Sequence, residues 1–266
     1  MKRALTLVLI ALTASCTAPS PPPTAGPSSS PTVTLPPENP APGDQATAFL
    51  DSKGSVRRYL VHAPATFTPS RTYPLVVVFH GSPGAPEDMP ELTKMNEVAD
   101  ANGFLVVYPR NMFDTAVFGE LLDHFVPKWS VDPKQVHVAG FSRGGSFVYE
   151  VAAAMPERFG SVAPVSAARN TNLPLSKPLS LIAFQGGADS LNVAWSTTNS
   201  GWDAAAGCSG DTLLKTTMQN STTYVHTSNC KEGTEHVVYD ISGMGHTWPA
   251  DGSRLIWEFF AKHPLA

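Results

Sequence analysis

The chain of 266 residues has the composition of a soluble globular protein, with 42% apolar and 15% charged residues, and this excludes a globally disordered polypeptide. Its 18 basic and 22 acidic residues give a formal net charge of -4 and form no lysine or arginine block that could neutralise a phosphate backbone or an anionic membrane surface. We therefore expect no nucleic-acid partner.

The N-terminal segment, residues 1–16, predicts an export signal. Two basic residues precede an apolar run over 4–14 that is too short to span a bilayer as a stable helix. The segment ends in "LTASC", which resembles a bacterial lipobox, in which the cysteine is lipidated and becomes the mature N-terminus. Thr13 stands where leucine is more usual in that box. Lipidation of Cys16 is the expectation, and ordinary signal cleavage that removes Cys16 or leaves it unmodified is the alternative.

The following stretch, residues 17–44, predicts a tether. It holds ten of the 25 prolines and almost nothing that could build a core. Such a composition gives an extended, solvated spacer, which suits a domain held away from a membrane by an acylated end. A proline-rich ligand for another protein is the alternative. Residues 45–266 are then expected to form one catalytic domain.

Apolar runs and helical patterns alternate along that domain. The predicted strands are residues 56–64, 74–81, 104–109, 136–140, 161–166, 179–186 and 236–242. The predicted helices are residues 91–101, 114–125, 144–155, 199–206 and 253–262. The run 74–81 has no polar face, as expected of a parallel strand covered on both sides. The alternation predicts an α/β fold with a mostly parallel central sheet and helices on both faces.

The two cysteines of the domain, Cys208 and Cys230, are expected to form a disulfide, because an exported chain meets an oxidising compartment. Closing a loop of about 22 residues would stabilise the fold by roughly 3 kcal/mol. Metal binding by two thiolates is a weak alternative, since no CxxC motif or paired histidines lie nearby. We expect no metal and no organic cofactor.

A glycine-flanked serine follows the strand predicted at 136–140. "GFSRGG", residues 140–145, fits G-x-S-x-G, in which a serine at a sharp strand-to-helix turn projects its hydroxyl above the sheet. The motif alone is weak, but its place between an apolar strand and a helical pattern is the context it requires. Ser142 is therefore the candidate nucleophile, and a plain turn serine is the alternative.

A serine hydroxyl needs a histidine to take its proton and a carboxylate to orient that histidine. Asp189 follows the strand predicted at 179–186, and His246 lies in a glycine-rich loop after the last strand, in the chain order of α/β-hydrolases. The competing acids are Asp240, inside a strand, and two residues in a region that we expect to form a cap, Asp203 and Asp211. The seven other histidines compete less well.

Acyl transfer also needs donors for the oxyanion. The stretch "FHGSPGAPED" ends the first fully buried strand, where the amide of Ser82 could point at the same spot as the amide of Arg143. An ordinary Gly/Pro turn is the alternative. The side chain of Arg143 is assigned no role.

Several segments together resemble a known family. They are "YPLVVVFHGSPGAPEDM", "NEVADANGFLVVYPR", "VDPKQVHVAGFSRGGSFVYEVAAAMPERFGSVAPVSA", "FQGGADS", "AAGC" and "GMGHTWP" with "LIWEFFAKHP". They are similar to the polyhydroxybutyrate depolymerase and feruloyl esterase family of α/β-hydrolases, which includes LpqC-like lipoproteins. The resemblance covers roughly residues 57–264.

The resemblance implies Ser142 as nucleophile, Asp189 as acid and His246 as base, with Ser82 and Arg143 as oxyanion donors. Members of that family cleave carboxylic esters: hydroxyalkanoate polyesters, or feruloyl and acetyl groups on plant polysaccharide. The chain departs from the family pattern where "YPRNMF" passes directly to "DTAVFGELLDHF", without the aromatic-containing insertion that helps to form the acyl pocket. "QGGAD" also replaces the more usual "HGTAD". His80, Trp202 and Trp248 are candidate pocket residues, and packing is the alternative for the tryptophans.

We therefore expect a monomeric serine esterase, secreted or anchored to the cell membrane by an N-terminal lipid, that acts on small or oligomeric esters. Two alternatives stay open at this point. The chain could be an inactive envelope lipoprotein that binds glycan or polyester, or it could be a serine peptidase.

Overall fold

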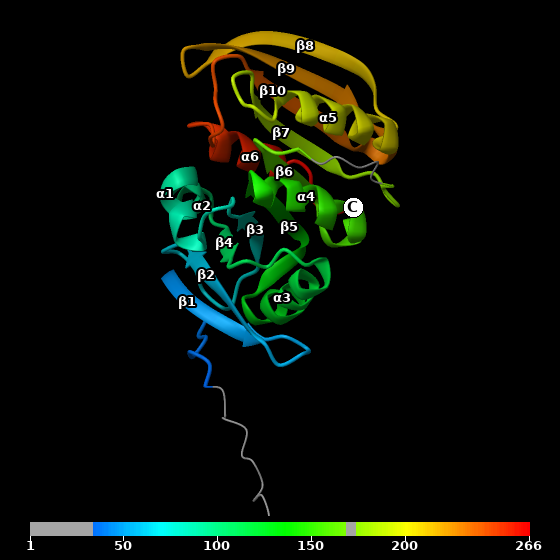
Figure 1. The fold of residues 1–266 in the computed structure, drawn as a ribbon. Coiled ribbons are helices and arrows are strands. Elements are labelled where there is room, and N and C mark those ends of the chain that lie inside the picture. Colours follow the sequence, from blue (N-terminus) through cyan, green and yellow to red (C-terminus); the bar gives the residue numbers. More distant parts are fainter. Residues whose placement is uncertain (1–33, 169–173) are drawn as a thin grey trace, which may run out of the picture. The chain divides into compact units, whose positions relative to one another are not determined.

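A computed structural model describes residues 34–168 and 174–266, which form a ten-stranded sheet with helices on both faces (Figure 1). The export segment, Cys16 and the tether up to residue 33 lie outside these residues. The strands are β1 (Gly43–Leu50), β2 (Val56–Ala63), β3 (Tyr73–Phe79), β4 (Leu105–Pro109), β5 (Val131–Phe141), β6 (Ser161–Val165), β7 (Ser180–Gly186), β8 (Ser209–Met218), β9 (Ser221–Asn229) and β10 (Glu235–Ile241). The helices are α1 (Met89–Thr93), α2 (Met95–Asn102), α3 (Thr115–Lys128), α4 (Arg143–Ala154), α5 (Asn192–Ala206) and α6 (Gly252–Phe260), with short 3₁₀ turns at Pro86–Asp88, Pro156–Arg158 and Lys231–Gly233.

The sheet has a parallel centre and antiparallel edges. Its strand order is β1-β2-β4-β3-β5-β6-β7-β10-β9-β8, and the six strands from β4 to β10 in that order run parallel. The pairs at each edge are antiparallel. Strands β3, β4, β6 and β7 are buried on both faces, as the apolar run of β3 predicts. The carboxyl ends of these strands therefore meet at one edge of the sheet.

Each face of the sheet carries its own hydrophobic core. Helices α3, α4 and α5 cover one face, and α1, α2 and α6 cover the other (Figure 1). Helix α4 directs Phe147 and Val151, spaced one turn apart, into the first of these cores. The predicted α/β fold with helices on both faces is confirmed.

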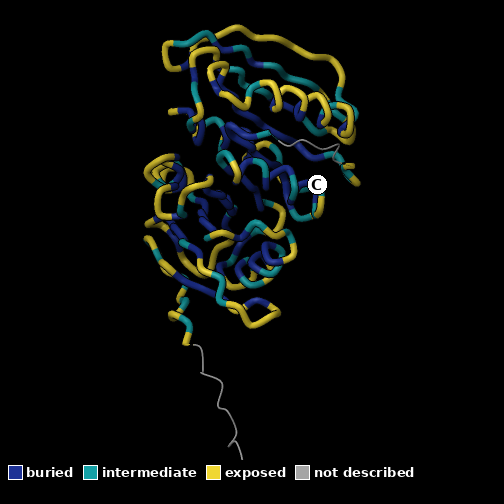
Figure 2. Tube along the Cα trace, viewed as in Figure 1, coloured by how far each residue is buried: buried dark blue, intermediate teal, exposed yellow. Residues whose placement is uncertain are grey.

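Three strands escaped the sequence-based prediction: β1, β8 and β9. Nine of the ten residues of β8 are exposed, and Figure 2 shows this edge strand as a continuous exposed trace. An edge strand with no buried face has no apolar pattern to reveal it. The expected cap is also wrong for the part of this region after α5, because the hairpin of β8 and β9 extends the central sheet instead.

Two helices differ from their predicted bounds. The helix predicted at 91–101 is two helices, because Lys94 adopts left-handed backbone angles (φ 54°, ψ 27°) that end α1 and begin α2. Helix α5 starts seven residues before the predicted 199. None of the helices in the described residues has both the length and the hydropathy needed to cross a membrane.

The predicted boundary between tether and domain at residue 44 lies too far along the chain. The compact unit begins at Leu35, and β1 already begins at Gly43. Glu38 is the reason, because its side chain is only 3% exposed and is held by four partners. These are Tyr59 Oη at 2.6 Å, Trp129 Nε1 at 2.7 Å, His124 Nε2 at 2.7 Å and Lys128 Nζ at 2.9 Å from its carboxylate oxygens. Residues 35–44 therefore belong to the folded domain.

Candidate active site

Ser142 occupies a strained turn between β5 and α4. Its backbone has φ 54° and ψ -117°, a region that non-glycine residues rarely adopt and that persists only when the surroundings enforce it. A Cβ atom at Gly140 would lie 2.5 Å from the backbone of Gly144, and one at Gly145 would lie 2.5 Å from Ala167 Cβ. Close packing against the backbone of Gly144 and the side chain of Ala167 thus requires glycine two residues before and three residues after the serine.

The strained turn brings the hydroxyl of Ser142 to His246. The Ser142 Oγ lies 2.9 Å from His246 Nε2, and the opposite ring nitrogen, Nδ1, lies 2.8 Å from Asp189 Oδ2. The Asp189 side chain is fully buried, whereas that of His246 is 38% exposed. With an ionised Asp189 accepting the proton of Nδ1, Nε2 is left as an acceptor for the serine hydroxyl.

Backbone contacts hold the loops of the acid and the histidine together. The amide of Gly187 donates to Ile241 O at 2.9 Å, and the amide of Ala188 donates to Met244 O at 3.0 Å. On the other side, the hydroxyl of Ser166 donates to the carbonyl of Thr247 at 3.0 Å. Asp189 and His246, 57 residues apart, are thus fixed to neighbouring parts of one scaffold.

The stretch after β3 lies against the nucleophile. A Cβ atom at Gly81 would be 3.2 Å from Ser142 Cβ, so the backbone leading to Ser82 passes beside the serine. The amide of Arg143 is at the N-terminus of α4, where backbone N–H groups lack helical acceptors. Within the described part of the chain, neither the Ser82 amide nor the Arg143 amide donates to a protein acceptor. Both are free to serve a ligand oxygen.

The three candidate pocket residues are buried, which for the two tryptophans favours the packing alternative. His80 is 1% exposed; its Nδ1 lies 2.7 Å from Gly81 O, and its Nε2 accepts from the Asn111 amide at 3.2 Å. Trp202 (2% exposed) and Trp248 (5%) pack in the cores on opposite faces of the sheet. His80 therefore joins the loop of Gly81 to that of Asn111, and the tryptophans are packing residues.

The competing acids and histidines lie in other contacts. Asp203 pairs with His236, and Asp211 pairs with His226 at 3.1 Å. Asp240 lies in β10 and forms no ion pair with a histidine of the described residues. The other histidines bind Asp44 and Asp100 (His62), Glu38 (His124), Ser161 (His137) and the carbonyl of Phe259 (His263). Of the candidate acids, Asp189 is the one in contact with His246.

Cys208 and Cys230 are joined in a disulfide, as predicted. It links the residue that follows α5 and its glycine cap to the end of β9. Cys208 also lies near Asp203 and His236, a grouping of metal-ligand types. Its sulfur is already bonded, so it has no thiolate to offer to an ion.

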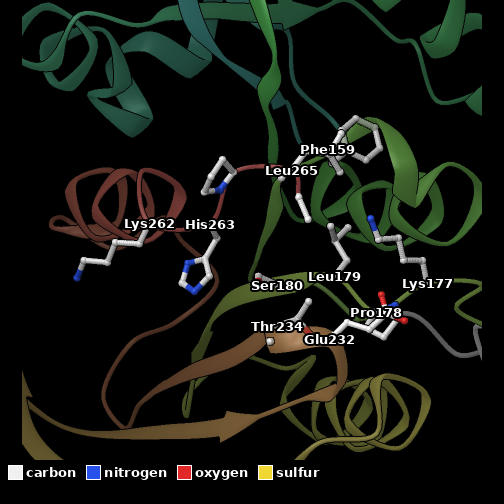
Figure 3. A pocket seen from close by; sticks show the side chains of 14 residues that line it. Phe159, Lys177, Pro178, Leu179, Ser180, Glu232, Thr234, Lys262, His263 and Leu265 are labelled. Carbon is white, nitrogen blue, oxygen red and sulfur yellow. The ribbon is translucent and has the colours of Figure 1, made fainter.

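A pocket of about 280 Å³ lies at the amino ends of β6, β7 and β10 (Figure 3). It is lined by the residues that precede β6, β7 and β10, among them Phe159, Leu179 and Thr234, and by the C-terminal segment with His263. The Ser142, Asp189 and His246 side chains follow the carboxyl ends of strands, where ligands of open α/β sheets bind. This pocket is therefore separate from the candidate site.

Sequence reasoning missed Phe113, which lies against the side chain of the residue that follows the nucleophile. The guanidinium carbon of Arg143 is 5.0 Å from the centre of the Phe113 ring. The residue lies in the short connection between β4 and α3. No periodic pattern covers that connection, so the sequence carried no signal for this contact.

Comparisons with known proteins agree with this geometry. The family model described as "Putative esterase" matches residues 108–250, which is more than half of the chain and contains all three residues. A bifunctional acetylxylan esterase/xylanase of Neocallimastix patriciarum is 29% identical over 129 residues, covering 44% of this chain and 19% of the relative. Feruloyl esterase B of Piromyces equi is 22% identical over 251 residues, covering 79% of this chain and 46% of the relative. The chain thus spans less than half the length of these curated relatives.

Solved structures share the fold. An acetyl xylan esterase from Aspergillus awamori superposes with a TM-score of 0.67 at 15% identity, covering 82% of this chain and 99% of that chain. The feruloyl esterase module from Clostridium thermocellum gives a TM-score of 0.60 at 13% identity, covering 84% and 90% respectively. At these identities the likeness establishes the α/β-hydrolase fold, which confirms the predicted fold class.

Proposed function

Because the chain belongs to the esterase family whose model matches residues 108–250, we propose that it is a serine hydrolase of carboxylic esters. The observation that carries this proposal is the unbroken chain of contacts from Ser142 Oγ through His246 to the buried Asp189, with both distances below 3 Å. A serine in a strained turn, joined to a base that a carboxylate orients, is the arrangement that acyl transfer requires.

In the proposed mechanism, His246 Nε2 takes the proton of Ser142 as its oxygen attacks the ester carbonyl. The oxygen that becomes negative is bound by the amides of Ser82 and Arg143. His246 then gives the proton to the leaving alcohol, and an acyl-enzyme remains. Water attacks that acyl group by the same route in reverse order, which releases the acid and restores the serine.

The substrate class that we propose is a small or oligomeric ester, either a hydroxyalkanoate oligomer or a feruloyl or acetyl ester of a sugar. Two of the similar proteins are an acetylxylan esterase and a feruloyl esterase, which supports the second group. The resemblance found in the sequence motifs supports the first. The imidazole of His246 is 38% exposed, so an oligomeric ester could approach it from solvent.

We further propose that the protein acts outside the cytoplasm. The basic and apolar segment at residues 1–16 is the basis for export, and Cys16 is the proposed site of a lipid anchor. The disulfide between Cys208 and Cys230 supports an oxidising location. Mass spectrometry of the protein recovered from a bacterial host would detect a diacylglyceryl group on Cys16 or show a chain cleaved elsewhere.

The decisive test compares wild type with Ser142→Ala on 4-nitrophenyl butyrate and with a fluorophosphonate probe. We expect kcat/KM to fall at least about a thousandfold in the variant, with probe labelling of the wild type alone. Circular dichroism of both proteins checks that the fold is kept. Equal turnover by the two would remove Ser142 from the mechanism, and an unlabelled wild type without turnover would favour a binding protein.

A further inference from the structure

The side chain of Arg143 places an unneutralised positive charge beside the nucleophile. Arg143 follows Ser142 directly, and its side chain is exposed. No carboxylate of residues 34–168 or 174–266 lies within ion-pair distance of it. Four of the other described arginines have such a partner: Arg57 with Asp51, Arg110 with Glu87, Arg158 with Asp123 and Arg254 with Glu258. Arg58 and Arg71 have none within the described residues either, but neither of them follows the nucleophile.

Phe113 supports the guanidinium from one side. Its ring centre lies 5.0 Å from Arg143 Cζ, and the ring is itself held edge-on by Phe147 at 5.7 Å and by His80 at 5.3 Å. A guanidinium over an aromatic face gains a cation–π attraction while the N–H donors in its plane stay available. The contact with Phe113 therefore restricts the position of the guanidinium, but it does not neutralise the positive charge.

Two acids of this region, Asp189 and Asp114, already have partners. Asp189 accepts from His246 through Oδ2 and from the Leu191 amide at 2.9 Å through Oδ1. Asp114, next to Phe113, caps α3 by accepting from the amides of Ala116 and Val117. The planar fork of donors on the exposed Arg143 side chain thus has no carboxylate of the described residues to bind.

We propose that Arg143 binds a carboxylate carried by the ester substrate itself, a few bonds from the carbonyl that is cleaved. Adjacent Cα atoms are about 3.8 Å apart, so the reach of an arginine side chain spans the distance from the serine to such a group. Guanidinium and carboxylate match in a two-bond geometry that a neutral ester cannot form.

This inference rests on the proposed esterase function and narrows its substrate class. The terminal unit of a hydroxyalkanoate oligomer carries a free carboxylate near the ester oxygen, whereas a feruloyl or acetyl ester of a neutral sugar carries none. Arg143 therefore favours hydroxy-acid esters that end in a free acid over neutral sugar esters.

The experiment uses two esters of one shape, 3-acetoxybutanoate and 3-acetoxybutanamide, with acetate release as the readout. We expect wild type to prefer the acid, and Arg143→Gln to reduce the ratio of the two kcat/KM values by about tenfold, chiefly through KM. Arg143→Lys should keep part of the preference, and added NaCl should weaken it. Arg110→Gln is the matched control, because that guanidinium already has Glu87 as its partner.

A ratio that differs by less than about twofold between wild type and Arg143→Gln would overturn the proposal. So would an equal fall in Arg110→Gln. The assay of 4-nitrophenyl butyrate separates this failure from that of the proposed function. Turnover that depends on Ser142 but shows no preference for the acid sinks the Arg143 proposal alone, whereas turnover that survives Ser142→Ala removes the esterase mechanism beneath it.

Discussion

Asp189 uses both oxygens of its carboxylate, and this makes its replacement informative. Oδ1 accepts from the amide of Leu191 and Oδ2 accepts from His246 Nδ1. In Asp189→Asn the Leu191 amide would keep the amide oxygen, so the NH₂ group would face the histidine. The imidazole would then carry its proton on Nε2 and could not accept one from Ser142.

We expect Asp189→Asn to lower kcat by about a thousandfold or more while leaving the unfolding transition close to that of wild type. Steady-state kinetics on 4-nitrophenyl butyrate would measure the loss. Asp211→Asn is the matched control, since that acid pairs with the exposed His226. A loss below about tenfold for Asp189→Asn, or an equal loss for Asp211→Asn, would contradict the assignment of the acid.

At the scale of residues, chain order and local context predicted Ser142, Asp189 and His246, and the structure places His246 in contact with both of the others. The aromatic residues were harder. Trp202 and Trp248 are large apolar groups near catalytic loops, but a sequence does not reveal whether such a ring faces a cleft or the core. Both face the core, since burying so much apolar surface is strongly favourable.

At the scale of elements, the strand–turn–helix unit around Ser142 depends on the absence of side chains at its glycines. A methyl group at Gly140 would lie 2.5 Å from backbone atoms of Gly144, a distance that only a shift of the turn can relieve. Gly201, inside α5, has nothing within 4 Å of the equivalent position and is the natural control.

We therefore expect Gly140→Ala to destabilise the protein by about 2 kcal/mol or more and to reduce esterase activity by displacing Ser142. Gly201→Ala should stabilise it by about 0.5–1 kcal/mol, because alanine loses less conformational freedom than glycine in a helix. Guanidinium unfolding of the two variants and wild type measures both effects. Equal stability of the three proteins would show that the turn tolerates a side chain.

Elements with a buried face were predictable, and elements without one were not. The central strands could be predicted because they are apolar runs. Strand β8 presents mainly polar, exposed residues and is held by backbone pairing with β9. The break at Lys94 had no sequence signal either, because it depends on a left-handed backbone that lysine rarely adopts. The length of α5 was underestimated because several polar residues in its first half mask its buried stripe.

At the scale of the whole molecule, Glu38 fastens the start of the folded domain to α3 and β2. Burial raises the pKa of Glu38, but hydrogen bonds from Tyr59, Lys128, Trp129 and His124 outweigh it and leave the pKa below its ordinary value. The unfolded chain therefore takes up a proton at higher pH than the folded one. The stability that Glu38 contributes is present above the ordinary pKa and is lost as the pH falls through the lowered one.

We expect Glu38→Ala to lower the free energy of unfolding by roughly 3 kcal/mol at pH 7, because it leaves buried donors and a lysine without their partner. The difference in the free energy of unfolding between wild type and Glu38→Gln should become smaller as the pH is lowered from 7 to below 4. Urea unfolding at several pH values measures both. Glu91→Gln, which removes an exposed partner of Lys94, should change stability by less than about 0.5 kcal/mol. If Glu38→Ala left the free energy of unfolding unchanged, the role of this contact would be contradicted.

The sequence assigned residues 35–44 to the tether because prolines outnumber apolar residues there. Composition reports what a segment can bury, not what it can bind. The partners of Glu38 are 21 to 91 residues away along the chain, so no local pattern could reveal them. The contacts of one buried carboxylate thus explain why the domain starts earlier than the composition predicts.

The place of Glu38 ahead of β1 also determines how the domain responds to mechanical load. Gly43 begins β1 opposite Ala63, so a force applied from the N-terminal side would separate this edge strand from β2 one residue pair at a time. Because Glu38 precedes β1, its contacts would bear the applied force before the first backbone pair of β1 and β2, and would distribute that force over α3 and β2. In an optical trap, wild type would then rupture at higher force than Glu38→Ala when pulled by its N-terminus.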